Sequence, residues 1–208
     1  MHSTNPGIAH HDRSCHLRNH RSNNIPALIM DWNRIIDKSW TLFLDRDGVI
    51  NTRLVDDYVK NINEFQFIPG VLEAFKIFAQ KFGRVIIVSN QQGVGKGLMT
   101  MSDVEHVHDY MLQEIASQKG RVDKIYVCPQ LKSDPDNFRK PSPRMAYMAQ
   151  HDFTEIDLEK SIMVGDMNSD LEFGKNCGMY TVLVGNEPVK IKPDAKYNTL
   201  FDFAKILK

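Results

Sequence analysis

The sequence has few cysteines, no excess of charge of either sign and no long apolar run. Its three cysteines, Cys15, Cys128 and Cys177, form neither a C-x-x-C zinc or redox pair nor the even number that a disulfide framework needs. Lysine and arginine (26) balance aspartate and glutamate (26), so the net charge does not favour nucleic acid as a partner. No segment reaches the roughly 18 apolar residues of a membrane span. We therefore expect a cytoplasmic protein that binds neither membrane nor nucleic acid.

The length and composition favour one folded domain. A chain of 208 residues with 42% hydrophobic residues can bury one sizeable α/β core. Residues 1–29 are rich in polar residues and histidine and show no periodicity, which predicts a disordered extension, and its histidine spacings match no common metal site. We hypothesise that Met30 is the physiological start. The prediction is a single domain over 30–208, expected to be monomeric.

An apolar run that ends in two carboxylates organises the chain. Residues 40–44 are Trp-Thr-Leu-Phe-Leu, and Asp45-Arg46-Asp47-Gly48 follow directly. The run predicts a buried strand of a parallel sheet, and a glycine after it permits a sharp turn. Residues i and i+2 of an extended strand share a face, so Asp45 and Asp47 can converge on one site.

The rest of the sequence alternates between strand and helix patterns, which indicates a parallel sheet with helical crossovers. The patterns predict further strands at 84–89, 122–128, 161–165 and 180–184, and helices at 71–82, 102–119, 142–149, 169–177 and 200–207. Three helix boundaries follow from local signals: Gly83 as a closing residue, Ser102 with Glu105 as a capping box, and Ser142 with Pro143 as a cap and first residue. Residues 51–67 predict a short hairpin-like flap, and 93–97 a flexible turn near the site. His106 and His108 are predicted to be surface or groove residues.

Polar residues follow four of these strands, and together they predict a phosphotransfer site. A carboxylate that attacks phosphorus needs cations to offset the repulsion between anions. Mg²⁺ prefers oxygen ligands, and Asp45, Asp166 and the backbone carbonyl of Asp47 are the predicted ones. Lys140 and Ser89 can contact phosphate oxygens. Asp47 then remains for proton transfer.

At these residues the sequence resembles the haloacid dehalogenase superfamily of phosphohydrolases. The resemblance covers 41–184 and implies that Asp45 is the nucleophile of an aspartyl-phosphate mechanism, Asp47 the general acid/base, Lys140 the phosphate-neutralising cation and Asp166 a metal ligand. Asp170 supports the metal site by the same resemblance. The implied fold is a three-layer, Rossmann-like α/β domain around a parallel sheet. Because 51–69 and 129–139 are short, we expect it to be capless.

Three sequence segments resemble one branch of this superfamily, the heptose 1,7-bisphosphate 7-phosphatases and histidinol-phosphate phosphatases. These segments are F-L-D-R-D-G-V-I-N, S-N-Q-Q-G-V-G-K-G and R-K-P-S-P. The resemblance implies contacts to substrate phosphate or hydroxyls from Asn51, Asn90, Gln91 and Arg139. The flap looks like the sugar-phosphatase version, with Tyr58 as a contact surface and Arg53 as a partner for a second phosphate.

Two positions depart from that branch. Its zinc loop is reduced here to Cys128, so we predict no zinc. Met167 stands where many relatives have a basic residue after the fourth-motif aspartate. The substrate expected is a small phosphorylated metabolite, specifically a heptose 1,7-bisphosphate. Alternatives are histidinol phosphate, for which Asp56 and Asp57 offer acidic neighbours, a polynucleotide 3′-phosphate, or a phosphate-binding module without turnover.

Overall fold

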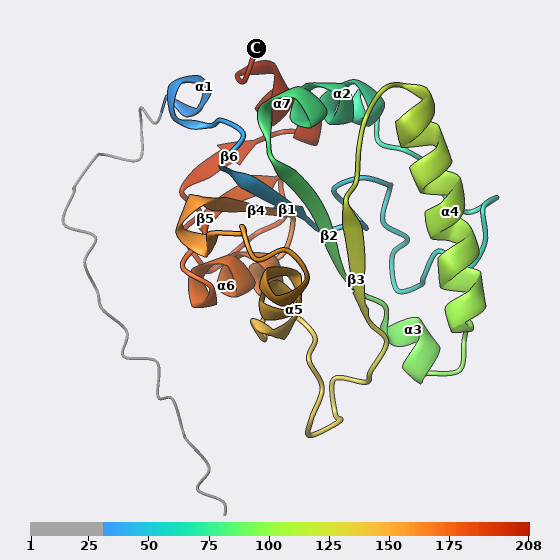
Figure 1. The fold of residues 1–208 in the computed structure, drawn as a ribbon. Coiled ribbons are helices and arrows are strands. Elements are labelled where there is room, and N and C mark those ends of the chain that lie inside the picture. Colours follow the sequence, from blue (N-terminus) through green and yellow to red (C-terminus); the bar gives the residue numbers. More distant parts are fainter. Residues whose placement is uncertain (1–30) are drawn as a thin grey trace, which may run out of the picture.

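The centre of the molecule is a six-stranded, fully parallel sheet (Figure 1). A computed structural model describes residues 31–208 of the protein. The predicted extension 1–29, with Cys15 and the proposed start at Met30, lies outside the described residues. The strands are β1 (Thr41–Leu44), β2 (Arg84–Asn90), β3 (Lys124–Cys128), β4 (Ser161–Gly165), β5 (Tyr180–Val184) and β6 (Ala195–Tyr197). The predicted α/β class with a central parallel sheet is confirmed.

The strand order places β1 next to the point where the chain changes direction across the sheet. The order is β3-β2-β1-β4-β5-β6, so the chain builds outward on one side of β1 and then crosses over to build outward on the other. Leu44 pairs with Ile87 of β2 and with Val164 of β4. A ligand of an open α/β sheet binds beyond the carboxyl ends of the strands at such a switch point. This places the residues after β1, β2 and β4 at the expected position of a site.

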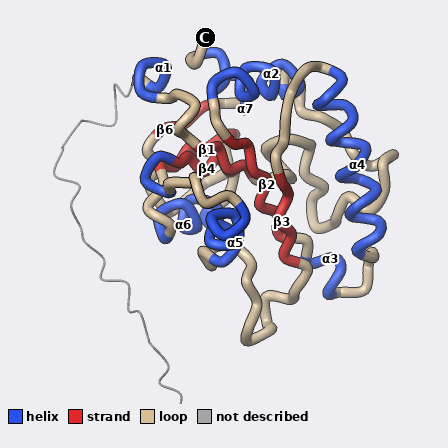
Figure 2. The backbone as a smooth tube through the Cα atoms, in the orientation of Figure 1, coloured by secondary structure: helices blue, strands red, loops and turns tan. Residues whose placement is uncertain are grey.

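Helices cover both faces of the sheet and make three layers (Figures 1 and 2). Side chains alternate along β1: Leu42 and Leu44 belong to one apolar cluster and Phe43 to the other. The first cluster packs under α2, α4 and α7, and the second under α5 and α6. The helices are α1 (Trp32–Ile35), α2 (Val71–Lys81), α3 (Gln92–Gly95), α4 (Met101–Ser117), α5 (Arg144–Asp152), α6 (Asn168–Asn176) and α7 (Leu200–Lys205), with a 3₁₀ turn at Leu158–Lys160.

Three of the predicted helix boundaries are wrong. Helix α4 begins at a capping box formed by Thr100 and Asp103, since Asp103 can reach back to the amide of Thr100. Helix α5 begins after Pro143, which is itself the cap residue, so Ser142 does not cap it. Gly83 does not close α2 in a left-handed conformation: the helix ends in extended Phe82, and a Cβ at residue 83 would lie 2.1 Å from the carbonyl oxygen of Lys38. Glycine at 83 is required by this close approach of two backbones.

The two intervals in which a lid could be inserted contain only loops in the described structure. Residues 51–67 form no strand pair; a single bridge joins Asn51 to Phe67, so the predicted hairpin is reduced to its base. Residues 129–143 run from β3 to α5 without a helix or strand. Residues 93–97, predicted to be a flexible turn, include most of α3. Within 31–208 no helix combines the length and the apolar character needed to cross a membrane.

Candidate active site

Three carboxylates converge at the carboxyl ends of β1 and β4. Asp45 directly follows β1, Asp166 follows β4, and Asp170 lies in the first turn of α6. One carboxylate oxygen from each lies within 4.8 Å of the others. Asp170, which was predicted to support the metal site, lies in this cluster. The carboxylate of Asp47 is not part of this cluster and is hydrogen-bonded to Arg46, Asn51 and Gln91, so its backbone carbonyl remains for the metal role predicted for it.

Lys140 is the buried cation of this cluster. Its Nζ lies 2.8 Å from Oδ1 of Asp45 and 2.7 Å from Oδ1 of Asp170. Burial lowers the pKa of Lys140, but the carboxylates of Asp170 and Asp45 outweigh it and raise the pKa above its usual value. Asn90, at the end of β2, fixes the backbone of this residue: its Oδ1 accepts from the amide of Lys140 and its Nδ2 donates to the carbonyl. Lys140 is therefore charged and held where a phosphate on Asp45 would lie.

One ammonium group does not offset the charge of three carboxylates, of which Asp166 and Asp170 are buried and Asp45 is 14% exposed. Burial, partly offset by Lys140 but reinforced by Asp170, raises the pKa of Asp45 to about 6. Burial and the carboxylates of Asp45 and Asp170 raise the pKa of Asp166 to about 8. Oδ1 of Asp166 is buried and has no hydrogen-bond donor within the described chain. An excess of anionic oxygen, with one oxygen unsatisfied, fits a hard divalent cation such as Mg²⁺.

Two further residues shape the approach to this oxygen cluster. Arg53, on the flap, donates to Oδ2 of Asp166, and its other terminal nitrogen contacts the sulfur of Met167. Gly48 has a positive φ of 87°, and a Cβ at this position would lie 1.8 Å from Oδ2 of Asp166. The turn after β1 therefore needs glycine both for its conformation and for the close approach of Asp166.

Asp47 accepts hydrogen bonds from three side chains that fix its carboxylate. Nη2 of Arg46 lies 2.9 Å from both oxygens, Nδ2 of Asn51 lies 2.9 Å from Oδ1, and Nε2 of Gln91 lies 2.8 Å from Oδ2. Burial raises the pKa of Asp47, but Arg46 and the two amides outweigh it and hold that pKa below its usual value. Asp47 is thus ionised and rigidly oriented in the free protein.

Two buried residues behind Asp47 were not assigned a role from the sequence. Arg46 is fully buried, and its Nη1 lies 3.1 Å from Nε2 of His108 on α4. The prediction of His108 as a surface or groove residue is wrong, because only 7% of it is exposed. The signal was present: His108 occupies the same helical face as the buried residues Val104, Val107, Met111 and Ile115.

Several residues predicted to hold substrate lie behind the site in the structure. Asn51 and Gln91 are fully buried, and their amides donate to Asp47. Ser89 is 1% exposed and accepts from Nε2 of Gln91. These contacts indicate that Asn51 and Gln91 orient Asp47. The hydroxyl of Ser89 lies in the same network, and its predicted contact with phosphate stays a prediction.

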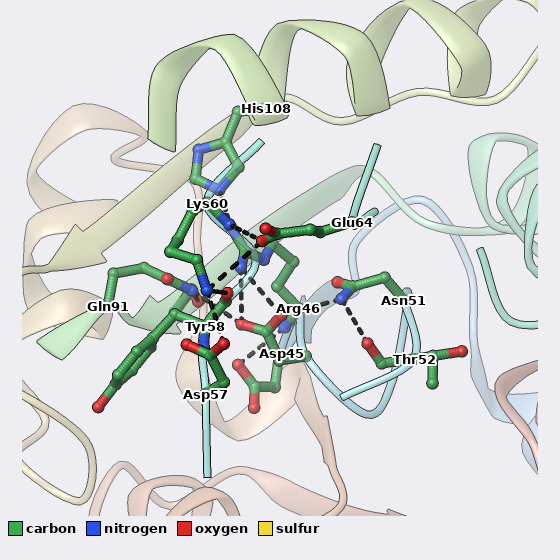
Figure 3. A network of polar contacts seen from close by, with 12 residues as sticks. Asp45, Arg46, Asn51, Thr52, Asp57, Tyr58, Lys60, Glu64, Gln91 and His108 are labelled. Atoms are coloured by element: carbon green, nitrogen blue, oxygen red, sulfur yellow. Dashed lines mark hydrogen bonds and ion pairs between the residues drawn. The ribbon is translucent and has the colours of Figure 1, made fainter. Parts of the chain in front are cut away.

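The remaining predicted substrate residues, Arg139 and Tyr58, are partly exposed at the edge of the site. Nη1 of Arg139 donates to Oε1 of Gln92 in α3. Tyr58 belongs to the flap, next to Asp57 and Lys60 (Figure 3). Its ring covers Gly93, and the ammonium of Lys96 lies 5.3 Å from the ring centroid. Both side chains are available to a bound molecule, and their predicted role is not tested by these contacts.

The relatives found by comparing sequences agree with those found by comparing structures. A family model described as HAD-hydrolase-like matches residues 137–197. D-glycero-alpha-D-manno-heptose-1,7-bisphosphate 7-phosphatases from Mycobacterium tuberculosis and Campylobacter jejuni are 38% and 39% identical, covering 79% and 74% of this chain and 90% and 86% of their own. A crystal structure of D,D-heptose 1.7-bisphosphate phosphatase from B. bronchiseptica, complexed with magnesium and phosphate, has a TM-score of 0.72 at 29% identity, covering 81% of this chain and 97% of that one. The similarity therefore extends over about three quarters or more of the chain.

Proposed function

We propose that this chain, which belongs to the haloacid dehalogenase-like hydrolases, hydrolyses the 7-phosphate of a heptose 1,7-bisphosphate through an aspartyl phosphate on Asp45. The observation that carries the proposal is the arrangement at one edge of the sheet: a nucleophilic carboxylate 2.8 Å from a buried lysine, a carboxylate cluster suited to Mg²⁺, and a second aspartate fixed by N–H donors. This set supplies a nucleophile, charge neutralisation and proton transfer.

In the first step a carboxylate oxygen of Asp45 attacks the phosphorus of the substrate. The bond between phosphorus and the ester oxygen breaks. Asp47, which takes a proton from the entering phosphate monoanion, delivers that proton to the ester oxygen as it leaves. Lys140 lies against Asp45, so it can stabilise the charge that develops on the transferred phosphoryl group. The products of this step are the sugar with a free 7-hydroxyl group and an acyl phosphate on Asp45.

In the second step water attacks the phosphorus of the aspartyl phosphate and releases inorganic phosphate. Asp47, now ionised, removes the proton from this water, and the carboxylate of Asp45 is restored. Asp45, Asp166, Asp170 and the backbone carbonyl of Asp47 are the groups that would hold Mg²⁺. The ion supplies positive charge that offsets the repulsion between the carboxylates and the substrate phosphate.

The relatives favour the α-anomer of the sugar. The two relatives at 38% and 39% identity are both named for D-glycero-alpha-D-manno-heptose 1,7-bisphosphate. In this chain Arg139, Lys96 and Tyr58 border the site, and a partly exposed cation is a suitable contact for a second phosphate. Arg53, which the sequence suggested for this purpose, is paired with Asp166 in the free protein. We therefore place Arg139 ahead of Arg53 for that contact.

The alternative of histidinol phosphate has less support from the geometry. It depends on acidic neighbours for a cationic substrate, and Asp57 is already paired with Lys60 at 2.6 Å. Lys60 also lies 3.7 Å from Glu64, so its ammonium offsets part of the negative charge of this segment of the flap (Figure 3). A polynucleotide 3′-phosphate remains without an observation in its favour.

A substrate panel tests the proposal. The purified protein is assayed with Mg²⁺ on the α- and β-anomers of heptose 1,7-bisphosphate, on histidinol phosphate and on a 3′-phosphorylated oligonucleotide. We expect the α-anomer to have the highest kcat/KM. Histidinol phosphate or the oligonucleotide leading by about tenfold, roughly 1.4 kcal/mol of transition-state stabilisation, contradicts the substrate assignment. A lead of the β-anomer contradicts only the choice of anomer.

A further inference from the structure

The guanidinium of Arg46 connects Asp47 to helix α4. Nη2 of Arg46 donates to both oxygens of Asp47, each at 2.9 Å, and Nη1 lies 3.1 Å from Nε2 of His108. Figure 3 shows His108 reaching down from the helix to this group. Because a guanidinium has only donors, Nε2 of His108 must be the acceptor. Burial and the nearby Arg46 lower the pKa of His108 to about 3, so the ring is neutral and its Nε2 lone pair is available.

The position of the guanidinium depends on these two partners. The Arg46 side chain is fully buried, and its Nε has no acceptor within residues 31–208. Asp47 and His108 are therefore the groups that fix its rotation. If the acceptor on His108 were lost, Nη1 would be a buried donor without a partner, and the guanidinium would turn away from its present position to find one.

We propose that His108 is a positioning residue for the reaction: by accepting from Arg46 it holds the guanidinium, which in turn holds the carboxylate of Asp47 toward the leaving oxygen. This inference rests on the proposed function, because it concerns proton transfer by Asp47. The side chain of Asp47 is 24% exposed, so the network covers most of it and leaves a restricted edge for the proton. A shift of the guanidinium would move both carboxylate oxygens at once.

The alternative is that His108 is only a buried residue of the α4 core. The two roles differ in their dependence on the leaving group. An alkoxide leaving group requires a proton from Asp47, whereas 4-nitrophenolate leaves without one. Loss of the positioning role therefore lowers kcat/KM for an alkyl phosphate more than for 4-nitrophenyl phosphate. A general loss of structure lowers both equally.

The test compares His108→Phe, which removes the acceptor, with His108→Gln, whose amide oxygen can take the place of Nε2. His106→Phe is the matched control, because His106 is exposed two residues earlier on the same helix. Each variant is assayed on 4-nitrophenyl phosphate and on the alkyl phosphate that the wild-type protein hydrolyses best, and kcat/KM is compared because it reports the steps through phosphoryl transfer to Asp45. Thermal unfolding is measured in parallel.

We expect His108→Phe to lower kcat/KM for the alkyl phosphate by about tenfold or more, which is a part of the roughly 10²- to 10⁴-fold that general acid catalysis contributes, and for 4-nitrophenyl phosphate by less than about threefold. His108→Gln and His106→Phe should keep the wild-type ratio of the two rates. An equal loss on both substrates, or no loss on either, overturns the inference. If His108→Phe does not fold, His108→Asn is used in its place, since the shorter amide cannot reach Arg46. The inference is then overturned if the Asn and Gln variants have the same ratio of kcat/KM on the two substrates.

The wild-type measurements separate this inference from the proposed function. A wild-type protein that prefers an alkyl phosphate other than the heptose overturns the substrate assignment alone, and the ratio is then measured on the preferred phosphate. A wild-type protein that hydrolyses no phosphomonoester overturns both. A normal wild-type panel with an unchanged ratio in His108→Phe overturns only the role of His108.

Discussion

Replacing Asp166 with asparagine should stabilise the metal-free protein and remove its response to Mg²⁺. Asp166 is buried beside Asp45 and Asp170, and these surroundings raise its pKa to about 8 from a reference value of 3.8. Between these two pH values the folded protein binds more protons than the unfolded chain. The free energy of unfolding therefore falls as pH rises through this window. An amide of the same shape carries no charge, so the variant does not lose this stability.

The size of the effect follows from the pKa of Asp166. One pKa unit corresponds to about 1.4 kcal/mol, so the penalty is on the order of 4 kcal/mol at pH 7 and close to zero near pH 4. The variant also loses the charge of the contact with Arg53, a side chain that is 32% exposed and can turn to water. We expect a net gain of about 1–3 kcal/mol at pH 8 and a smaller gain at pH 5.

Urea unfolding in the presence of EDTA at pH 5 and pH 8 measures this difference. Asp109→Asn is a matched control, because Asp109 is exposed on α4 and should show no pH-dependent change. Addition of Mg²⁺ should raise the unfolding temperature of the wild-type protein and leave Asp166→Asn nearly unchanged, since binding to the folded state stabilises it by mass action. The reasoning is refuted if Asp166→Asn is less stable than the wild type at pH 8 in EDTA, or if the difference is the same at both pH values.

Three further substitutions test the rest of the site. Asp45→Asn should abolish turnover, and an acid quench should trap no phosphoenzyme in this variant. Residual activity above about one part in 10² would contradict a nucleophilic role. Lys140→Met should leave buried Asp45 and Asp170 without their shared cation and lower the free energy of unfolding by about 3–5 kcal/mol in urea titrations, whereas a loss below about 1 kcal/mol would contradict the ion-pair argument. Gly48→Ala should weaken Mg²⁺ binding at least about tenfold by calorimetry, because its Cβ would displace Asp166; an unchanged dissociation constant would disprove this.

Strands β1 to β5 could be predicted from the sequence because each is a largely apolar run of sufficient length, although β3 lies at an edge of the sheet and is only partly buried. The same strand pattern predicted that Asp45, Lys140 and Asp166 converge, since parallel strands place their carboxyl ends at one edge of the sheet. Short elements were missed: β6 has three residues, and α1 and α3 have four each, which is too short for a periodic pattern to be distinguished from a loop.

Side-chain direction is the part of the site that the sequence does not determine. Asn51 and Gln91 were expected to contact substrate, and in the structure of the free protein their amides donate to Asp47. Their motif placed them near the site correctly, while the backbone turn after each strand decides which way they point. Asp170 was expected to support the metal site, and its contact with Lys140 was not predicted. It reaches Lys140 only because α6 begins directly beyond β4 and turns its first residues toward the sheet edge.

The two aspartates of the D-x-D motif have opposite electrostatic environments, and the residue between them contributes to both. The backbone amide of Arg46 donates to Asp45 at 2.7 Å, while its guanidinium pairs with Asp47. Burial leaves Asp45 with a raised pKa, so its charge depends on Lys140 and on a bound cation, whereas Arg46 keeps Asp47 ionised. Carboxylates whose pKa values are pushed apart take different roles in a reaction. Because Asp47 is ionised in the free protein, the proton that it gives to the leaving oxygen must enter with the substrate, on the phosphate monoanion, and the same ionised carboxylate then serves as the base for the attacking water.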